Sequence, residues 1–337
     1  MGNVGMKNFA RLALSVVAIA TLAAPARAAN EQASVAVAGV NLLFLSQYVA
    51  ADQHLWEKRG LDVKVLNIVG IGAMNALISG SVNFSMSSGA AITRAVARGQ
   101  KLVALATAIN QTGQSIIIRK DVAEAGHFDP NAPLSVRAQF LKGRTIAHGA
   151  TAGVPDVVLK AVGKAGGVAP DQMLATPMQP PEFMAAFAAK KIDGFSNSPP
   201  FVEQTLIEGT GVLLSDTRKG EPTEFSPVSS AVLMTKADYC AKDKSICDKM
   251  VKGLVDALVF IREQPDATVA VMKAHFGAYD DKVLRAAYET VRALTAVPPV
   301  TTPKMLENSD SLNVAAGFLK AEEKLPHYDD LIDNSFQ

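Results

Sequence analysis

The sequence predicts an α/β protein of two similar lobes, each formed by a mainly parallel sheet flanked by helices. Strand-like and helix-like segments alternate over short loops, which is the pattern of repeated βαβ units. In addition, MNALISGSVNFSMSS at 74–88 and MAAFAAKKIDGFSNS at 184–198 share one order of amphipathic helix, polar break, buried strand and new helix. The polar strand ends of two such lobes would face each other, so the sequence predicts a cleft between them.

The first 28 residues are interpreted as a cleaved export signal. Lys7 and Arg11 give a basic start, residues 12–24 are apolar, and the small-x-small motif ARA at 26–28 suits cleavage. An apolar run of 13 residues is shorter than the roughly 20 that a membrane-spanning helix needs. No cysteine near the cleavage site offers a lipid attachment point. We expect a soluble periplasmic protein, with a retained N-terminal anchor as the alternative.

The composition is compatible with two ordinary hydrophobic cores and gives no sign of a strongly charged partner. The chain has 337 residues, 49% of them apolar, and a formal net charge of +1. Cleavage after residue 28 removes three basic residues and no acid, which leaves 30 basic against 32 acidic residues and a net charge of −2. We therefore expect a monomer that binds no nucleic acid.

The first lobe is expected to comprise residues 29–113 and 229–337. Its last third is mainly helical, and prolines such as Pro265 and Pro303 separate the helices. Strands are predicted at 34–40, 61–69, 82–86, 101–109 and 229–236. Helices are predicted at 44–58, 73–79, 89–98, 246–263, 266–275, 280–294 and 303–322.

The second lobe is expected to comprise residues 114–228, with chain crossings near 110–118 and 215–230. Two such thin connections would form a two-strand hinge, suited to closure around a ligand. The polar stretch 121–133 is interpreted as an excursion loop. Strands are predicted at 114–120, 144–148, 173–177, 192–196 and 211–214. Helices are predicted at 153–165, 181–189 and 199–208.

Cys240 and Cys247 are expected to form a disulfide, because an exported protein meets an oxidising compartment. In one continuous helix this spacing would place the two residues about 10 Å apart, at about 1.5 Å per residue. A disulfide tolerates roughly 7 Å between Cα atoms. A helix must therefore break within 241–246, where Asp243 or Ser245 would cap the next helix. Two unpaired structural thiols are the alternative.

The common catalytic and cofactor motifs are absent from the sequence. No G-x-S-x-G, H-E-x-x-H or P-loop occurs, and the histidines show no metal-ligand spacing. Gly70-Ile71-Gly72 follows a strand and opens a helix, but the third glycine and the later acid of a dinucleotide site are missing. We therefore expect no cofactor, no metal and no catalytic residue. A helix start with glycines would instead let backbone N–H groups attract an anion.

Polar residues follow several predicted strands, at the edge where open α/β sheets bind ligands. Ser87-Ser88 and Asn197-Ser198 are interpreted as hydroxyl and amide donors, with helix capping as the alternative. His148 ends the strand predicted at 144–148. It is either a ligand contact or a rim residue that bonds to backbone.

Three segments resemble the periplasmic solute-binding proteins of the nitrate, sulfonate and taurine type, which feed ABC importers. GLDVKVLNIVGIGAMNALISGSVNFSMSS is similar to that family's strand, glycine loop and AL..G.VDF signature. LKGRTIAHG is similar to its DLKGKTIGV strand, and EFMAAFAAKKIDGFSNSPP to its AL.AG.VDA....P signature. The resemblance covers about residues 33–235 and implies the two-lobed periplasmic binding protein fold of the second type. Asn83 in place of aspartate, and Lys190-Lys191 in place of Ala-Gly, depart from the pattern.

The resemblance implies non-catalytic capture of a small molecule and its delivery to an inner-membrane ABC permease. The family also has relatives that bind or form thiamine precursors, but the cysteine-rich motif of the synthases is absent here. An exported enzyme on the same scaffold and a ligand-sensing module for a membrane receptor are the alternatives. The predicted binding residues are Asn41, Phe44, Gly72, Ser87, Ser88, Asn110, His148, Thr151, Gly153, Asn197, Ser198 and Ser229.

The charge pattern predicts an anionic ligand of the sulfonate or carboxylate class. No acid occurs from 63 to 120 or from 130 to 155. Backbone N–H groups at helix starts near Gly72, Gly89 and Gly153 are expected to join the contacts. Glu182, near the cleft, either reverses this preference or complements a helix dipole. The basic residues expected to set a positive field rather than make contacts are Lys64, Arg94, Arg98, Lys101, Arg119, Arg137, Lys142 and Arg144.

Overall fold

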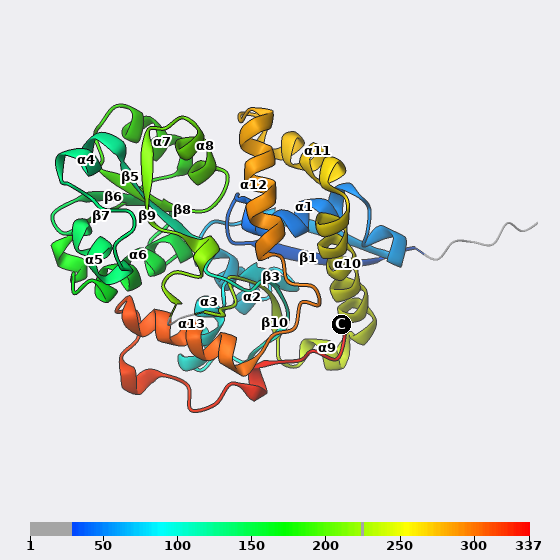
Figure 1. Ribbon diagram of the computed structural model, residues 1–337. Coiled ribbons are helices and arrows are strands. Elements are labelled where there is room, and N and C mark those ends of the chain that lie inside the picture. The colour runs from blue at the N-terminus through cyan, green and yellow to red at the C-terminus, as the bar shows by residue number, and fades with distance from the viewer. Residues whose placement is uncertain (1–28, 224–225) are drawn as a thin grey trace, which may run out of the picture.

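The protein folds into two α/β lobes that lie side by side (Figure 1). The computed structural model describes residues 29–223 and 226–337. The predicted export signal, residues 1–28, lies outside the described residues. We name the lobes by their sheets: lobe I holds the sheet that begins with the first strand, and lobe II holds the other sheet.

The lobe I sheet has five strands in the order β2-β1-β3-β10-β4. Four strands are parallel, and β10 runs antiparallel to both of its neighbours, β3 and β4. The strands are β1 (Glu31–Val37), β2 (Leu61–Asn67), β3 (Phe84–Ser87), β4 (Leu102–Ile109) and β10 (Ala231–Lys236).

The lobe II sheet repeats this plan in the order β7-β6-β8-β5-β9, with β5 as the antiparallel strand. Its strands are β5 (Ser115–Arg119), β6 (Thr145–His148), β7 (Leu174–Pro177), β8 (Gly194–Asn197) and β9 (Gly211–Ser215). β3 and β8 are the strands of the two similar sequence segments, and they hold the same central place in the two sheets. In each sheet the antiparallel strand is the one that the chain forms on crossing from the other lobe.

Helices cover both sheets, and short side-chain caps fix where several of them begin. Ser88, Asp280 and Thr302 each accept a bond from a backbone N–H in the first turn of the helix that follows. Lobe II carries α4 (Lys120–Ala125), α5 (Leu134–Ala138), α6 (Val154–Ala165), α7 (Pro180–Ala188) and α8 (Phe201–Ile207). The other helices are α1 (Leu45–Asp52), α2 (Gly72–Ser79), α3 (Gly89–Ala97), α9 (Tyr239–Lys242), α10 (Lys244–Glu263), α11 (Pro265–Phe276), α12 (Asp281–Leu294) and α13 (Pro303–Ala315).

Three sequence predictions of secondary structure are wrong in part. The helix predicted at 44–58 ends at Asp52, because His54 adopts the left-handed conformation with φ 53°. The helix predicted at 303–322 ends at Ala315, and Gly317 with φ 76° turns the chain away. The stretch 121–133 is not wholly a loop, because α4 covers its first residues and buries Val122 and Ala123.

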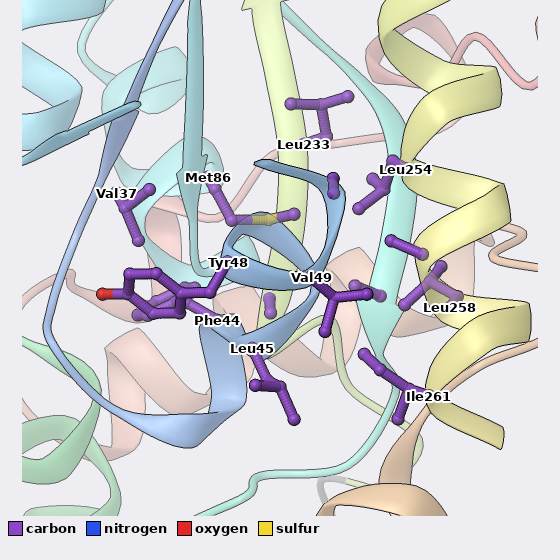
Figure 2. Close-up of a cluster of buried hydrophobic side chains, with 14 of the residues drawn as sticks. Val37, Phe44, Leu45, Tyr48, Val49, Met86, Leu233, Leu254, Leu258 and Ile261 are labelled. Carbon is purple, nitrogen blue, oxygen red and sulfur yellow. The ribbon is translucent and has the colours of Figure 1, made fainter. Parts of the chain in front are cut away.

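The main core of lobe I lies between the sheet and the helices α1 and α10. Figure 2 shows Val37, Met86 and Leu233 of the sheet pointing toward this layer. Trp56, only 2% exposed, closes the core by donating its indole N–H to the Met250 carbonyl, 3.0 Å away. In lobe II the rings of Phe183, Phe187, Phe195 and Phe201 stack in a chain of edge and tilted contacts. Each lobe therefore has its own apolar core.

The disulfide and the helix break predicted around it are both present. Cys240 and Cys247 are joined, with their Cα atoms 5.6 Å apart. α9 ends at Lys242 and α10 begins at Lys244, which brings the two cysteines within bonding distance. Asp243 occupies the cap position between the helices, although its side chain makes no capping hydrogen bond.

Two C-terminal helices join the lobes in addition to the two chain crossings. α12 contacts α8 of lobe II, where Thr290 Oγ1 donates to Glu203 Oε1 at 2.9 Å. α13 packs on both α3 of lobe I and α6 of lobe II, and Figure 1 shows it (orange) below them. The contact between the lobes is therefore wider than two linking strands.

Candidate ligand-binding cleft

A cleft of about 890 Å³ of empty space, including its open part, lies between the lobes. Its walls are the short segments that follow the carboxyl ends of β1, β2 and β3 in lobe I and of β6, β7 and β8 in lobe II. This is the edge where parallel α/β sheets bind ligands, because the loops and helix starts there leave backbone groups free. The wall segments are 38–41, 69–71, 87–88, 149–150, 152–155, 179–180 and residue 197.

The described lining of the cleft is mostly apolar and contains a single charged residue, Arg94 of α3. Among the described residues that line it there is no Asp, Glu, Lys or His. The side chain of Arg94 is buried, with 6% of the residue exposed. The polar side chains of this lining are Asn41, Ser87, Ser88, Gln114, Gln179, Asn197 and Ser230.

The Arg94 guanidinium is held by hydrogen bonds to two different parts of the fold. Nη1 donates to Asn313 Oδ1 of α13 at 3.1 Å, and Nη2 donates to the Ala152 carbonyl of lobe II at 3.0 Å. A guanidinium has five N–H donors, so donors remain for a ligand. Burial lowers the pKa of Arg94 below its ordinary value of 12.5, but an arginine stays charged at neutral pH.

The negative charge of Asp156 acts to raise the pKa of Arg94, but Asp156 forms no ion pair with it. Asp156 lies at the start of α6 and is paired with Lys160, whose Nζ is 3.0 Å from Asp156 Oδ1. His148 Nε2 lies 3.8 Å from the same oxygen, and burial lowers the pKa of His148, which is therefore neutral at pH 7. Over residues 29–223 and 226–337, no acid forms an ion pair with Arg94. This corner of the cleft carries one uncompensated positive charge.

One set of the predicted binding residues lines the cleft: Asn41, Phe44, Ser87, Ser88, Gly153 and Asn197. Three of them also serve the local backbone. Asn41 Oδ1 accepts from Leu43 N, Ser88 Oγ from Ala91 N, and Asn197 Oδ1 from Ser198 N. At Ser88 the capping role and the cleft position therefore coexist.

The other predicted binding residues do not line the cleft, and these are Gly72, Asn110, His148, Thr151, Ser198 and Ser229. Several of them are adjacent in sequence to a residue that lines the cleft, as Gly72 is to Ile71, Ser198 to Asn197, and Ser229 to Ser230. His148 is buried beside Asp156, and its Nδ1 has no hydrogen-bond partner in the described part of the chain.

Sequence reasoning missed several lining residues, above all Arg94, which was expected to act only through its field. The sequence could have predicted that Arg94 lies near the cleft, because it is on the helix that begins after Ser88, a residue already predicted at the cleft. Gln114 directly precedes β5 at a chain crossing. It lines the cleft, and its Oε1 has no hydrogen-bond partner among the described residues. Phe201 of α8 also lines the cleft but carried no polar signal in the sequence.

A model of the NMT1-like family matches residues 28–276, which is well over half of the chain. This chain belongs to the NMT1-like family. No curated protein sequence matches this NMT1-like protein. Solved structures do match it, at low sequence identity and over most of its length.

The alkanesulfonate-binding protein SsuA from Xanthomonas axonopodis pv. citri, bound to MOPS, is 16% identical. It covers 89% of this chain and 97% of its own, with a TM-score of 0.67. The nitrate-binding protein NrtA from Synechocystis PCC 6803 is 15% identical, covers 72% and 66%, and has a TM-score of 0.57. A mutant of DSZB in complex with biphenyl-2-sulfinic acid is 13% identical, covers 91% and 97%, and has a TM-score of 0.61.

These similarities show the fold. The two mixed sheets with flanking helices are the two-lobed architecture of periplasmic binding proteins, as the sequence predicted. The NMT1-like family match and the fold shared with sulfonate- and nitrate-binding proteins agree with the family that the sequence resembles. None of the helices formed by the described residues is long and apolar enough to cross a membrane. Nor do those residues gather three His, Cys, Asp or Glu side chains in a position to hold a metal.

Proposed function

We propose that this protein captures a small organic anion, a sulfonate or carboxylate, in the periplasm and delivers it to an ABC import permease. The observation that carries the proposal is the buried, uncompensated charge of Arg94 in a cleft whose described lining contains no acid. A buried charge without a counter-ion is costly, by several kcal/mol in typical proteins. An anion seated in the cleft would supply the missing partner.

Helix starts add to this preference. α2, α3, α6 and α7 all begin at the cleft, with their first residues or N-caps in its lining. The N-terminus of a helix presents N–H groups and a partial positive charge. This effect is reduced at α6 and α7, because their first turns contain prolines, which have no N–H, and the acids Asp156 and Glu182. The starts of α2 and α3 have no acid in the first turn, so these two ends favour a negative group over an ammonium group.

The apolar part of the lining favours an organic over an inorganic anion. Val40, Val69 and Ile71 line the cleft, and each leaves close to half of its surface exposed, at 48%, 47% and 50%. Phe44 and Phe201 add aromatic surface. An alkyl or aryl group bound here would remove apolar area from water, worth roughly 25 cal/mol per Å². A bare inorganic anion would gain nothing from this surface.

Capture would follow from closure of the lobes around the anion. The cleft is built from both lobes, so a ligand that contacts both stabilises the closed form by its differential affinity. The crossings near 110–118 and 215–230 are proposed to act as the hinge, between lobe I residues 29–113 and 229–337 and lobe II residues 114–228. Residues 224 and 225 of the second crossing lie outside the described residues. The likeness to the binding proteins SsuA and NrtA, together with the export signal predicted for residues 1–28, supports import from the periplasm.

An exported enzyme on the same fold is the second class to be tested, since a sulfinic acid occupies the DSZB structure. The lining offers Ser87 and Ser88 as hydroxyls, and Ser88 is already used as a helix cap. No histidine or acid in the described lining is present to activate either serine. We therefore favour binding without catalysis. A sensor for a membrane receptor would use the same cleft, and neighbouring genes for a permease and an ATPase would favour the importer.

Thermal unfolding of the mature protein tests the ligand class. The panel is hexanesulfonate, benzenesulfonate, benzoate, nitrate, hexylamine and glucose, matched in concentration. A ligand present at 100 times its Kd adds about 2.7 kcal/mol of stability, so a binder raises the Tm clearly. We expect the organic anions to raise the Tm more than nitrate does. A rise with hexylamine or glucose and none with any anion would overturn the proposal.

A further inference from the structure

Asn313 of α13 is fully buried and contacts Arg94 from outside the cleft lining. Its Oδ1 accepts from Arg94 Nη1 at 3.1 Å, and its Nδ2 donates to the Ala90 carbonyl at 2.7 Å and to Thr93 Oγ1 at 3.2 Å. A backbone carbonyl only accepts, so the amide nitrogen of Asn313 must point toward the Ala90 carbonyl, which leaves the amide oxygen for Arg94. Both partners belong to α3, so α3 fixes the orientation of the Asn313 side chain.

Phe318 forms a second support for the same guanidinium. Its ring centroid lies 5.3 Å from Arg94 Cζ and 4.3 Å from Lys160 Nζ. Both distances suit a cation on the face of an aromatic ring. The Phe318 N–H donates to the Asn313 carbonyl at 2.8 Å, so the two supports are tied together.

α13 and the turn that follows it carry these supports between the lobes. Leu312 and Ala316 pack on Val157 and Ala161 of α6, while Asn313 bonds to α3. No described residue of α13 lines the cleft. The position of the Arg94 guanidinium thus depends on a helix that the ligand would not touch.

We infer that Asn313 is a positioning residue for Arg94, which sets the anion affinity of a cleft that Asn313 itself does not line. The inference rests on the proposed function and extends it to a named residue of α13. The chemistry of an amide matters here. Asn313 offers Arg94 an uncharged acceptor, so it holds the guanidinium without cancelling its charge. A carboxylate at this position would form an ion pair with Arg94 and compete with the bound anion.

Calorimetric titration of matched variants with hexanesulfonate and benzoate tests this role. Asn313→Ala removes a hydrogen bond to a charged group, so affinity should fall roughly tenfold or more. Asn313→Asp should lower affinity further, because it also neutralises Arg94. The control is Ser311→Ala on the same helix. Ser311 Oγ donates to the Glu307 carbonyl at 2.9 Å and does not line the cleft, so its loss should leave the Kd within about twofold of wild type.

The melting temperature of each variant separates positioning from mere support of the fold. Asn313 variants that melt lower but bind both probes as tightly as wild type would overturn the inference and leave the proposed function standing. Failure of wild type to bind either probe would overturn the proposed function and the inference with it. Where Asn313→Asp does not fold, the comparison of Asn313→Ala with Ser311→Ala decides, since each removes one hydrogen-bonding side chain from α13.

Discussion

The contact between Glu203 and Thr290 gives a prediction about stability that involves both lobes. Glu203 of α8 is buried at 7% exposure, and Thr290 Oγ1 of α12 donates to its Oε1. Its Oε2 has no hydrogen-bond partner in the described part of the chain. Replacing Thr290 by valine keeps the shape and removes the donor. A hydrogen bond to a charged group contributes about 1.5–3 kcal/mol, which is the expected loss while Glu203 is ionised.

The loss should depend on pH. Burial is the largest cause that raises the pKa of Glu203 above its ordinary 4.5. Thr290 and the charge of Arg218 act to lower this pKa, and Asp216 acts to raise it. A raised folded-state pKa means that the stability Glu203 contributes is fully present below about 4.5 and is lost as pH rises through the folded-state value. Below about pH 4.5 the Glu203 carboxyl is neutral in the folded protein. Thr290→Val should then lower the free energy of unfolding by only about 0.5–1.5 kcal/mol.

Urea unfolding of wild type, Thr290→Val and Glu203→Gln from pH 4 to pH 9 measures both effects. Glu203→Gln cannot ionise, so its stability relative to wild type should rise with pH. The control is Glu208→Gln, because Glu208 is exposed and bonds to Gln204 at the end of the same helix. Two results would contradict a raised pKa of Glu203. One is the same pH dependence of the unfolding free energy in Glu203→Gln and wild type, and the other is an equal loss of unfolding free energy in Thr290→Val at pH 4 and pH 9.

Three further predictions concern the disulfide, the lobe I core and closure. Replacing Cys240 and Cys247 by serine should lower the free energy of unfolding by roughly 2–3 kcal/mol, read from denaturant midpoints, and an unchanged midpoint would contradict this. Gly253→Ala should destabilise by about 1–3 kcal/mol, because the added Cβ would clash with Cδ1 of the Trp56 ring; wild-type stability would show that Trp56 moves freely. Small-angle scattering should show a smaller radius with saturating hexanesulfonate, and an equal radius would count against hinge closure.

The order of strands and helices was largely predictable, because each βαβ unit has a local pattern of apolar and polar residues that the sequence shows directly. The two similar segments even placed β3 and β8 in equivalent positions. What the pattern could not reveal is direction. β5 and β10 look like the other buried strands in sequence, and only the crossing between lobes makes them antiparallel.

Some of the residues predicted from the strand ends line the cleft, and others lie one residue away from a lining residue. Ser230 lines the cleft and its neighbour Ser229 does not. Hydrophobic periodicity does not predict which of two adjacent serines after a loop faces the cleft. The place of the Arg94 side chain in the lining could not be predicted, for a different reason. Its guanidinium bonds to Asn313 and to the Ala152 carbonyl, which lie far away in sequence and meet it only in the folded protein. Such long-range packing leaves no local signal.

In the proposed function, the charge of Arg94 binds an organic anion in the cleft. Calorimetric titration of hexanesulfonate into wild type, Arg94→Gln and Arg98→Gln tests it most directly. Arg98, which follows α3, is exposed and does not line the cleft, so it controls for a general change of charge. We expect a loss of roughly 10- to 100-fold in affinity for Arg94→Gln and little change for Arg98→Gln. Equal affinity in wild type and Arg94→Gln would contradict it.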